Sequence, residues 1–122
     1  MSTGDSTCCG KFQIDYSGNN QLRFNTSGAT IAMTLDADEW QHFVFTKEYF
    51  GANYVSSYNH KLTYYKDGEY LDNKTQVETR WDKLKIGLNR LGGSYWKGYI
   101  DDLRIYTRAL TADEVEELFE SY

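Results

Sequence analysis

The stretch that decides the fold is GYIDDLRIYTRALTADEVEELF, residues 98–119. In its first part apolar and polar residues alternate with a period of two, which predicts a half-buried strand over Trp96–Tyr106. In its second part Thr111 and Glu114 have the spacing of a capping box, and the apolar residues then recur at helical spacing. The sequence therefore predicts a two-faced strand that leads into a short helix over residues 112–120.

Short segments with the same period of two precede this stretch. Turn residues separate them, and Asp67-Gly68 is a strong hairpin signal. Such an arrangement is typical of an antiparallel β-sandwich or barrel. The segment Trp40–Lys47 is apolar on both faces, so we expect it to be a central, covered strand. The predicted strands are Lys11–Ser17, residues 22–25, residues 31–35, Trp40–Lys47, His60–Lys66, Glu69–Leu71, Lys83–Leu88 and Trp96–Tyr106.

Length and composition fit one all-β domain over residues 1–122, with residues 1–9 as a flexible N-terminal loop. Aromatic residues make up 16% of the chain, with eleven Tyr, a composition that favours sheets and binding surfaces. The net charge is −5 and no basic cluster is present, which argues against nucleic acid as a partner. No apolar run approaches the ~20 residues of a membrane-spanning helix.

Cysteine and histidine are scarce. Cys8 and Cys9 are adjacent, so we expect two free thiols; an intermolecular disulfide or a metal contact is the alternative. His42 lies in the predicted covered strand and is expected to be a core histidine. His60 opens a strand and has no Ser, Cys or Asp partner in the sequence around it.

Several pieces of the sequence resemble laminin-G-like domains of the concanavalin A-like lectin/glucanase superfamily. The most specific piece is the run from Gly98 to Phe119, and three weaker pieces precede it in the family's order: residues 40–46, 62–71 and 85–87. The resemblance covers residues 11–120. It implies an antiparallel jelly-roll β-sandwich with one short C-terminal helix, and an extracellular or cell-surface location.

This chain departs from the family pattern at its start, because family members usually begin with more strands than it has room for. A sandwich that lacks strands exposes an edge or an apolar patch. We therefore expect the domain to form a homo-oligomer or to pair with a missing N-terminal segment.

The resemblance also raises two chemical questions. Some family members use calcium, and Asp101, on the apolar face of its predicted strand, is the candidate ligand; a hydrogen-bonded structural carboxylate is the preferred interpretation, because calcium needs about six oxygens. The glucanases of the superfamily use the spacing Glu-x-Asp-x-x-Glu, which is missing from this sequence. We therefore predict no cofactor and no enzymatic activity.

Two segments rich in aromatic and amide residues, 48–59 and 89–96, are the candidate ligand-binding loops. Sugars stack their C–H faces on aromatic rings and pair their hydroxyls with amides, so the best expectation is a lectin-like carbohydrate-binding module. The alternative is a structural or adhesive protein–protein module that self-associates. The predicted ligand-binding residues are Tyr49, Tyr54, Tyr58, Asn59, Asn89, Tyr95 and Trp96.

Overall fold

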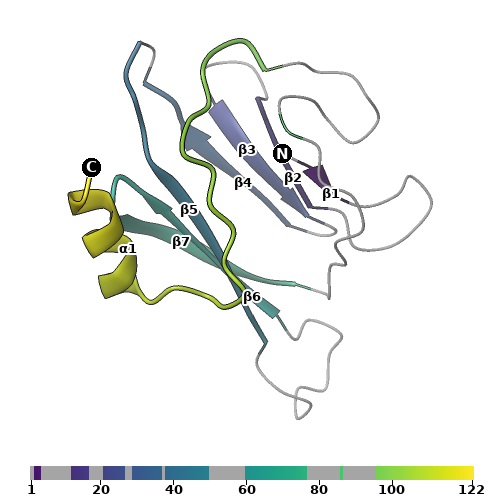
Figure 1. Cartoon of the computed structure of the whole chain (residues 1–122). Coiled ribbons are helices and arrows are strands. Elements are labelled where there is room, and N and C mark those ends of the chain that lie inside the picture. The colour runs from purple at the N-terminus through teal and green to yellow at the C-terminus, as the bar shows by residue number, and fades with distance from the viewer. Residues whose placement is uncertain are drawn as a thin grey trace. The chain divides into compact units, whose positions relative to one another are not determined.

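A computed structural model gives the fold as two compact units, each with its own antiparallel sheet (Figure 1). The first unit comprises Met1–Ala37 and Val77–Asp101, and the second comprises Asp38–Gln76 and Asp102–Tyr122. The residues that the structure describes are 2–3, 12–16, 21–26, 29–36, 38–49, 60–76, 86 and 96–122.

The sheet of the first unit is a meander of neighbouring strands in the order β1-β2-β3-β4. Leu22 on β3 lies directly opposite Met33 on β4, and both side chains are buried, whereas Gln21 and Thr34 beside them are exposed. The alternation that predicted these strands is therefore confirmed in the structure. The strands are β1 (Ser2–Thr3), β2 (Phe12–Tyr16), β3 (Gln21–Thr26) and β4 (Ala29–Thr34). The expectation of a flexible loop over residues 1–9 is wrong at Ser2–Thr3, because these two residues pair with β2.

The second unit contains a sheet of three antiparallel strands: β5 (Phe43–Tyr49), β6 (His60–Lys66) and β7 (Glu69–Gln76). The middle strand is β6, whose residues 62–65 are all buried. Because successive side chains of a strand point to opposite faces, both faces of β6 are covered.

The prediction that Trp40–Lys47 is a central, covered strand is wrong. The strand begins only at Phe43, and Trp40, before it, is 71% exposed. In the described three-stranded sheet β6 pairs with both β5 and β7, and so lies between them. The covered central position belongs to His60–Lys66 instead.

The Asp67-Gly68 hairpin is confirmed. Both residues have positive φ, 51° and 82°, as a two-residue hairpin turn with a matching twist requires. The strand that follows is longer than the predicted Glu69–Leu71, since it continues through polar residues to Gln76. Polar residues are suited to this position because β7 lies at the end of the described strand order.

Helix α1 (Ala112–Glu120) has the predicted bounds and the predicted capping box. Its buried residue is Val115, which is completely inaccessible to solvent. Near its C-terminal end Phe119 approaches the hairpin turn so closely that a Cβ on Gly68 would lie 3.0 Å from its ring. Gly68 is thus required both for the turn and for the docking of the helix.

The predicted strand over Trp96–Tyr106 is not formed. These residues belong to no sheet ladder, and Tyr99 is 88% exposed. Asp102 has a φ of 49°, which interrupts the extended backbone that a strand needs. Asp101 is exposed, so its predicted apolar surroundings are also wrong. Of the predicted strand Lys83–Leu88 the structure describes Ile86, at a bend; the rest lies outside the described residues.

Candidate functional site

The end of the β5–β6 pair presents two rings to solvent. Tyr49 is the last residue of β5 and His60 the first of β6, and the strand register places them directly opposite each other. Their ring centroids are 5.3 Å apart and the ring planes are inclined by 52°. Tyr49 is 58% exposed and His60 is half-buried. We call these two residues the Tyr49–His60 platform.

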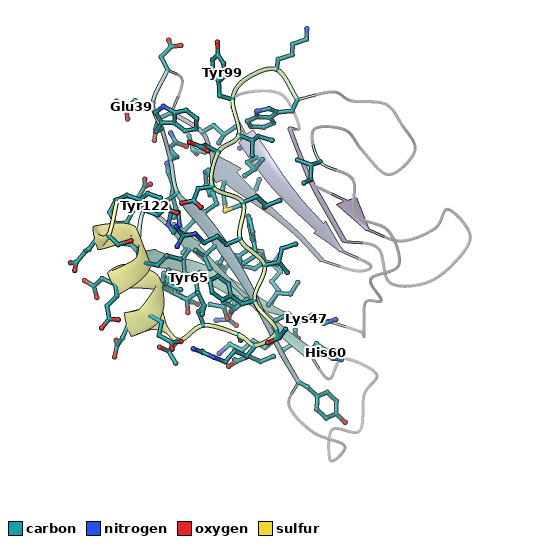
Figure 2. The ribbon with its side chains drawn as sticks, viewed as in Figure 1. Glu39, Lys47, His60, Tyr65, Tyr99 and Tyr122 are labelled. Atoms are coloured by element: carbon teal, nitrogen blue, oxygen red, sulfur yellow. The ribbon has the colours of Figure 1, made fainter. Side chains whose placement is uncertain are left out.

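The platform lies on the same face of the sheet as the aromatic pair Phe45–Tyr64. Every second residue pair of β5 and β6 lies on the same face, so Phe45 with Tyr64, Lys47 with Leu62 and Tyr49 with His60 follow one another on it. The Phe45 and Tyr64 rings meet edge to face at 5.9 Å, and Tyr64 is fully buried. In Figure 2 His60 lies at the end of the sheet remote from α1, whereas Tyr65 lies nearer to the helix. The strands thus hold an apolar ring surface in solvent at a fixed place.

The structure describes two of the seven predicted ligand-binding residues, Tyr49 and Trp96. Trp96 is half-buried in the first unit, and its buried Nε1 has no hydrogen-bond partner among the described residues. The segment 50–59, which joins Tyr49 to His60 in the sequence, carries three of the others. Outside the described residues lie Tyr54, Tyr58, Asn59, Asn89 and Tyr95.

The part of His60 in the platform was missed from the sequence. The contribution of His60 could have been predicted from the strand ends, because the last residue of one strand and the first residue of the next are cross-strand neighbours in a hairpin. The predicted strand Trp40–Lys47 ended two residues too early, so the pairing of Tyr49 with His60 was not visible.

The opposite end of the same sheet is fastened by His42. Its backbone N–H donates to Asp67 Oδ1 at 2.9 Å, and the Asp67 N–H donates to the His42 carbonyl at 2.8 Å. The two bonds clamp the hairpin turn to the residue that leads into β5. Asp67 therefore serves both as a turn residue and as a hydrogen-bond acceptor.

The His42 ring packs against the C-terminal end of the chain. It stacks on Phe119 with centroids 6.0 Å apart, and the Tyr122 ring lies 5.3 Å away. Burial lowers the pKa of His42, an effect that the nearby Asp67 partly opposes. The buried Nδ1 finds no hydrogen-bond partner within the described part of the chain. The histidine is half-buried and precedes the strand, so its predicted place inside a covered strand is wrong.

A charged network holds Tyr122 in this position. Arg104 binds both carboxylate oxygens of Asp102, at 2.9 and 2.8 Å, and the Tyr122 hydroxyl donates a short hydrogen bond to the same carboxylate. The Arg104 guanidinium also lies 5.6 Å from the centre of the Tyr122 ring. Hydrogen bonds from Arg104 and Tyr122 lower the pKa of Asp102, so the carboxylate is ionised. Asp102 and Arg104 thus act as an anchor for the end of the chain.

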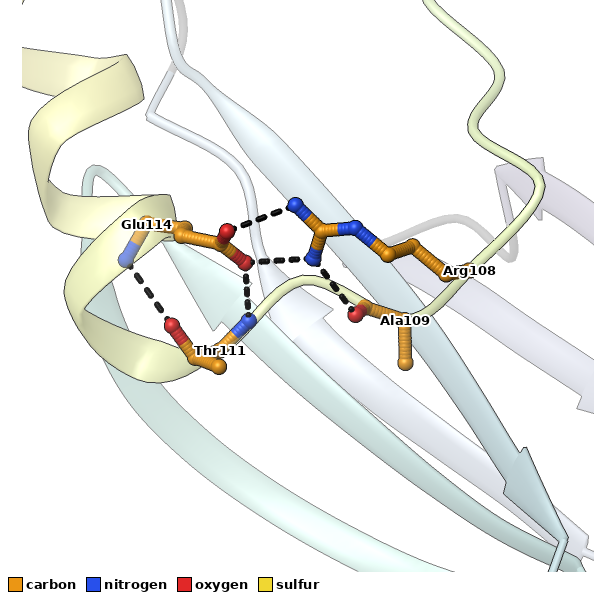
Figure 3. Close-up of polar contacts among 4 residues, drawn as sticks. All are labelled: Arg108, Ala109, Thr111 and Glu114. Carbon is orange, nitrogen blue, oxygen red and sulfur yellow. Dashed lines mark hydrogen bonds and ion pairs between the residues drawn. The ribbon is translucent and has the colours of Figure 1, made fainter.

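The charges at the start of α1 have a similar role (Figure 3). Arg108 forms two hydrogen bonds with the Glu114 carboxylate, at 2.7 and 2.6 Å, and the same carboxylate accepts the Thr111 N–H at 2.9 Å. These contacts lower the pKa of Glu114 to about 2, with the Arg108 hydrogen bonds as the largest cause. The Thr111 hydroxyl accepts the Glu114 N–H at 3.2 Å and completes the helix cap.

The described residues contain no group of three His, Cys, Asp or Glu side chains that could hold a metal ion. None of the helices in the described part of the chain is long and apolar enough to cross a bilayer. Two carboxylates of the C-terminal signature, Asp102 and Glu114, form ion pairs with Arg104 and Arg108.

Comparison with known proteins identifies the family. The family described as the concanavalin A-like lectin/glucanases superfamily, of laminin-G type, matches residues 1–116. Comparison with curated proteins and with solved structures gave no significant match. The family match and the antiparallel strands with one short C-terminal helix confirm the predicted fold class, an antiparallel jelly-roll β-sandwich. This chain therefore belongs to the laminin-G-like domains of the concanavalin A-like lectin/glucanase superfamily.

Proposed function

We propose that this domain is a non-catalytic carbohydrate-binding module whose ligand stacks on the Tyr49–His60 platform. The observation that carries the proposal is the exposed ring of Tyr49, which lies beside the His60 ring at the end of the β5–β6 pair and is fixed by strand pairing. A sugar ring offers an apolar C–H face of matching size, and a ring held in solvent by ordered strands costs little conformational entropy on binding.

Residues next to the platform carry polar groups that can form hydrogen bonds with sugar hydroxyls. On the face of the platform, Lys47 lies opposite Leu62 two positions inward, and the connecting residues 50–59 include two Asn, two Ser and two Tyr. Ammonium, amide and hydroxyl groups are usual partners of sugar hydroxyls in a binding site.

Two observations favour binding over hydrolysis within a superfamily that holds both lectins and glucanases. The sequence lacks the Glu-x-Asp-x-x-Glu spacing that would place a nucleophile and an acid on either side of a glycosidic bond. The acidic groups Asp102 and Glu114 are engaged by Arg104 and Arg108, which keep the pKa of each carboxyl low. A general acid needs a raised pKa instead.

A glycan array followed by calorimetric titration of the best glycan tests the proposal. We expect micromolar binding that Tyr49→Ala weakens by roughly tenfold or more, as the loss of one stacking ring predicts. Tyr70→Ala is the matched control, because Tyr70 is 53% exposed on the same sheet and lies opposite Tyr65, at the other end of β6.

Two further variants test the predicted loops. Tyr54→Ala and Trp96→Ala are expected to weaken binding if the segments 48–59 and 89–96 contact the glycan. An array without signal, or a Tyr49→Ala variant that binds as tightly as the unmodified domain, would refute the carbohydrate proposal. We would then assign the domain the alternative function, that of a structural or adhesive protein–protein module.

A further inference from the structure

We propose that Asn73 is an acceptor for an N-linked oligosaccharide when the chain is made in a secretory pathway. The proposal concerns a covalent modification and does not involve the Tyr49–His60 platform. It rests on the sequence Asn73-Lys74-Thr75, on the exposure of Asn73 and Thr75, and on the face of the sheet to which the strand register assigns them.

The sequence contains the acceptor pattern of N-linked glycosylation, Asn-x-Ser/Thr with any residue except Pro in the middle, at two places. These are Asn25-Thr26-Ser27 and Asn73-Lys74-Thr75. The first triplet begins in β3, which pairs with β2 on one side and with β4 on the other. The second lies in β7, at the end of the strand order in the described part of the chain. The structure describes the side chains of the second triplet, so the inference concerns Asn73.

The first and third residues of this triplet are exposed, and Lys74 between them is half-buried. Because Asn73 and Thr75 are two positions apart in a strand, their side chains share one face of the sheet. A glycan is bulky and hydrophilic, so a folded domain carries it on a side chain that reaches solvent. The Asn73 amide nitrogen meets this condition, because it donates to the hydroxyl of Tyr70 at 2.6 Å and Tyr70 is itself 53% exposed.

The bulge in β7 brings Tyr70 to the face of the sheet that carries Asn73. Asn73 lies opposite Thr63, whereas Tyr70 lies opposite Tyr65, and Leu71 is the extra residue between the two. In a regular strand, residues three positions apart point to opposite faces, but the extra residue puts Tyr70 and Asn73 on one face. The hydrogen bond between their side chains agrees with this assignment.

The group transfer leaves the Asn73 amide one donor for Tyr70. The sugar donor is an oligosaccharide linked through its anomeric carbon to a polyprenyl diphosphate, and the oligosaccharyltransferase of the host catalyses the reaction. A bond forms between Asn73 Nδ2 and the anomeric carbon, and the bond from that carbon to the phosphate oxygen breaks. The polyprenyl diphosphate leaves with the bonding electrons, and the amide gives up one proton. Because the free amide has two N–H groups, one remains, and the exposed Tyr70 ring offers an apolar face to the first sugar.

The modified face of the sheet is not the face of the platform. His60 and Thr63 are three positions apart in β6, so their side chains point to opposite faces. Tyr49 lies opposite His60, and Asn73 lies opposite Thr63. A glycan on Asn73 is therefore attached to the opposite face of the sheet from the platform.

Expression of the full chain behind a cleavable secretion signal in a eukaryotic cell line tests the inference. Intact mass gives the glycosylated fraction of the secreted and of the cell-associated chain. Peptide mapping after enzymatic release of the glycan identifies the site, because the release leaves Asp in place of the modified Asn. We expect a glycan on Asn73 of the unmodified chain and its complete loss in Asn73→Gln. Since Asn73 is exposed, the glycosylated chain and Asn73→Gln should give the same circular dichroism spectrum.

Matched variants separate recognition of the triplet from effects on the fold. Thr75→Ala removes the hydroxyl of the acceptor pattern, so the Asn73 glycan should be lost, whereas Thr75→Ser keeps a hydroxyl and should retain it. Asn25→Gln removes the other triplet and should leave the Asn73 glycan unchanged.

A chain without a glycan on Asn73, a glycan on Asn25 alone, or an Asn73 glycan that persists in Thr75→Ala would each overturn the inference. An Asn73 glycan found only on aggregated chain would overturn it as well, since an exposed side chain has room for a glycan in the folded domain. None of these readouts uses a ligand of the platform, so this inference and the carbohydrate-binding proposal can fail separately.

Discussion

The two ends of the three-stranded sheet of β5, β6 and β7 are built in opposite ways. At one end the Asp67-Gly68 turn is clamped by His42, covered by Phe119 and closed by the Tyr122 ring. At the other end Tyr49 lies more than half exposed beside His60, with no such closure among the described residues. We infer that the closed end stabilises the unit and leaves the open end available for a ligand. Substitutions at the two ends should therefore affect different properties.

The largest expected effect is at the closed end, with Val115→Asp. The Val115 side chain is completely buried where α1 packs, so an aspartate there leaves an unpaired carboxylate without solvent. We expect a loss of about 3 kcal/mol or more in the free energy of unfolding, measured by urea denaturation. Glu117→Asp, at an exposed position of the same helix, is the control and should change stability by less than about 0.5 kcal/mol.

The next effect is at the turn. Asp67→Ala removes the acceptor for the His42 N–H and places alanine at a φ of 51°, so we expect a loss of about 1–3 kcal/mol in urea denaturation. Asp67→Asn keeps a side-chain oxygen and tolerates this conformation, and it should lose less than half as much. Equal losses in the two variants would show that the clamp does not depend on the side-chain oxygen.

A smaller effect is expected at the start of the helix. Thr111→Ala removes the hydroxyl that accepts the Glu114 N–H. We expect the free energy of unfolding, measured by urea denaturation, to fall by about 1 kcal/mol, as is usual for a helix cap of this type. Thr111→Ser keeps the acceptor and should recover most of the lost stability, whereas a serine variant as weak as the alanine variant would contradict the capping role.

The Glu114 carboxylate of the capping box predicts that the stability of the domain falls in acid. The pKa of Glu114 is lowered from 4.5 to about 2, so the unfolded chain takes up the proton first as the pH falls. Its contribution is therefore complete above pH 4.5 and is lost between 4.5 and about 2. Thermal melting from pH 6 to 2 should show a smaller acid-induced loss in Glu114→Gln than in the unmodified domain, and identical profiles would contradict this assignment.

His42 predicts a loss of stability in a higher pH range. Burial lowers its pKa below 6.5, so the unfolded chain binds the proton more readily and stability falls as the pH drops below 6.5. His42→Phe keeps a ring against Phe119 but cannot take up a proton. Thermal melting between pH 7.5 and 5 should therefore vary less in His42→Phe than in the unmodified domain, and an unchanged slope would show that His42 does not cause it.

The closed end could be predicted from the sequence better than the open end. The Asp-Gly turn and the capping box are local, since the residues that form them are at most three positions apart, and both were predicted with the correct residues. The contact of His42 with Phe119 joins residues far apart in the sequence, and no local pattern encodes it.

The failure at Trp96–Tyr106 has a related cause. Its alternating pattern favours a strand, but a strand also needs a neighbour, and the positive φ of Asp102 interrupts the extended backbone. At the open end Tyr49 was predicted from composition alone, whereas His60 required the strand register.

The smallest expected effect on stability is that of Tyr49→Ala, and it is the sharpest test of the difference between the two ends. More than half of the Tyr49 side chain is exposed, so its removal should change the free energy of unfolding by no more than about 1 kcal/mol in urea denaturation. The same variant should bind the glycan roughly tenfold or more weakly, because one stacking ring is gone. If Tyr49→Ala instead destabilised the domain as much as Asp67→Ala, the ring would be a structural part of the sheet, and the open end would have to be assigned to the packing of the domain rather than to its ligand.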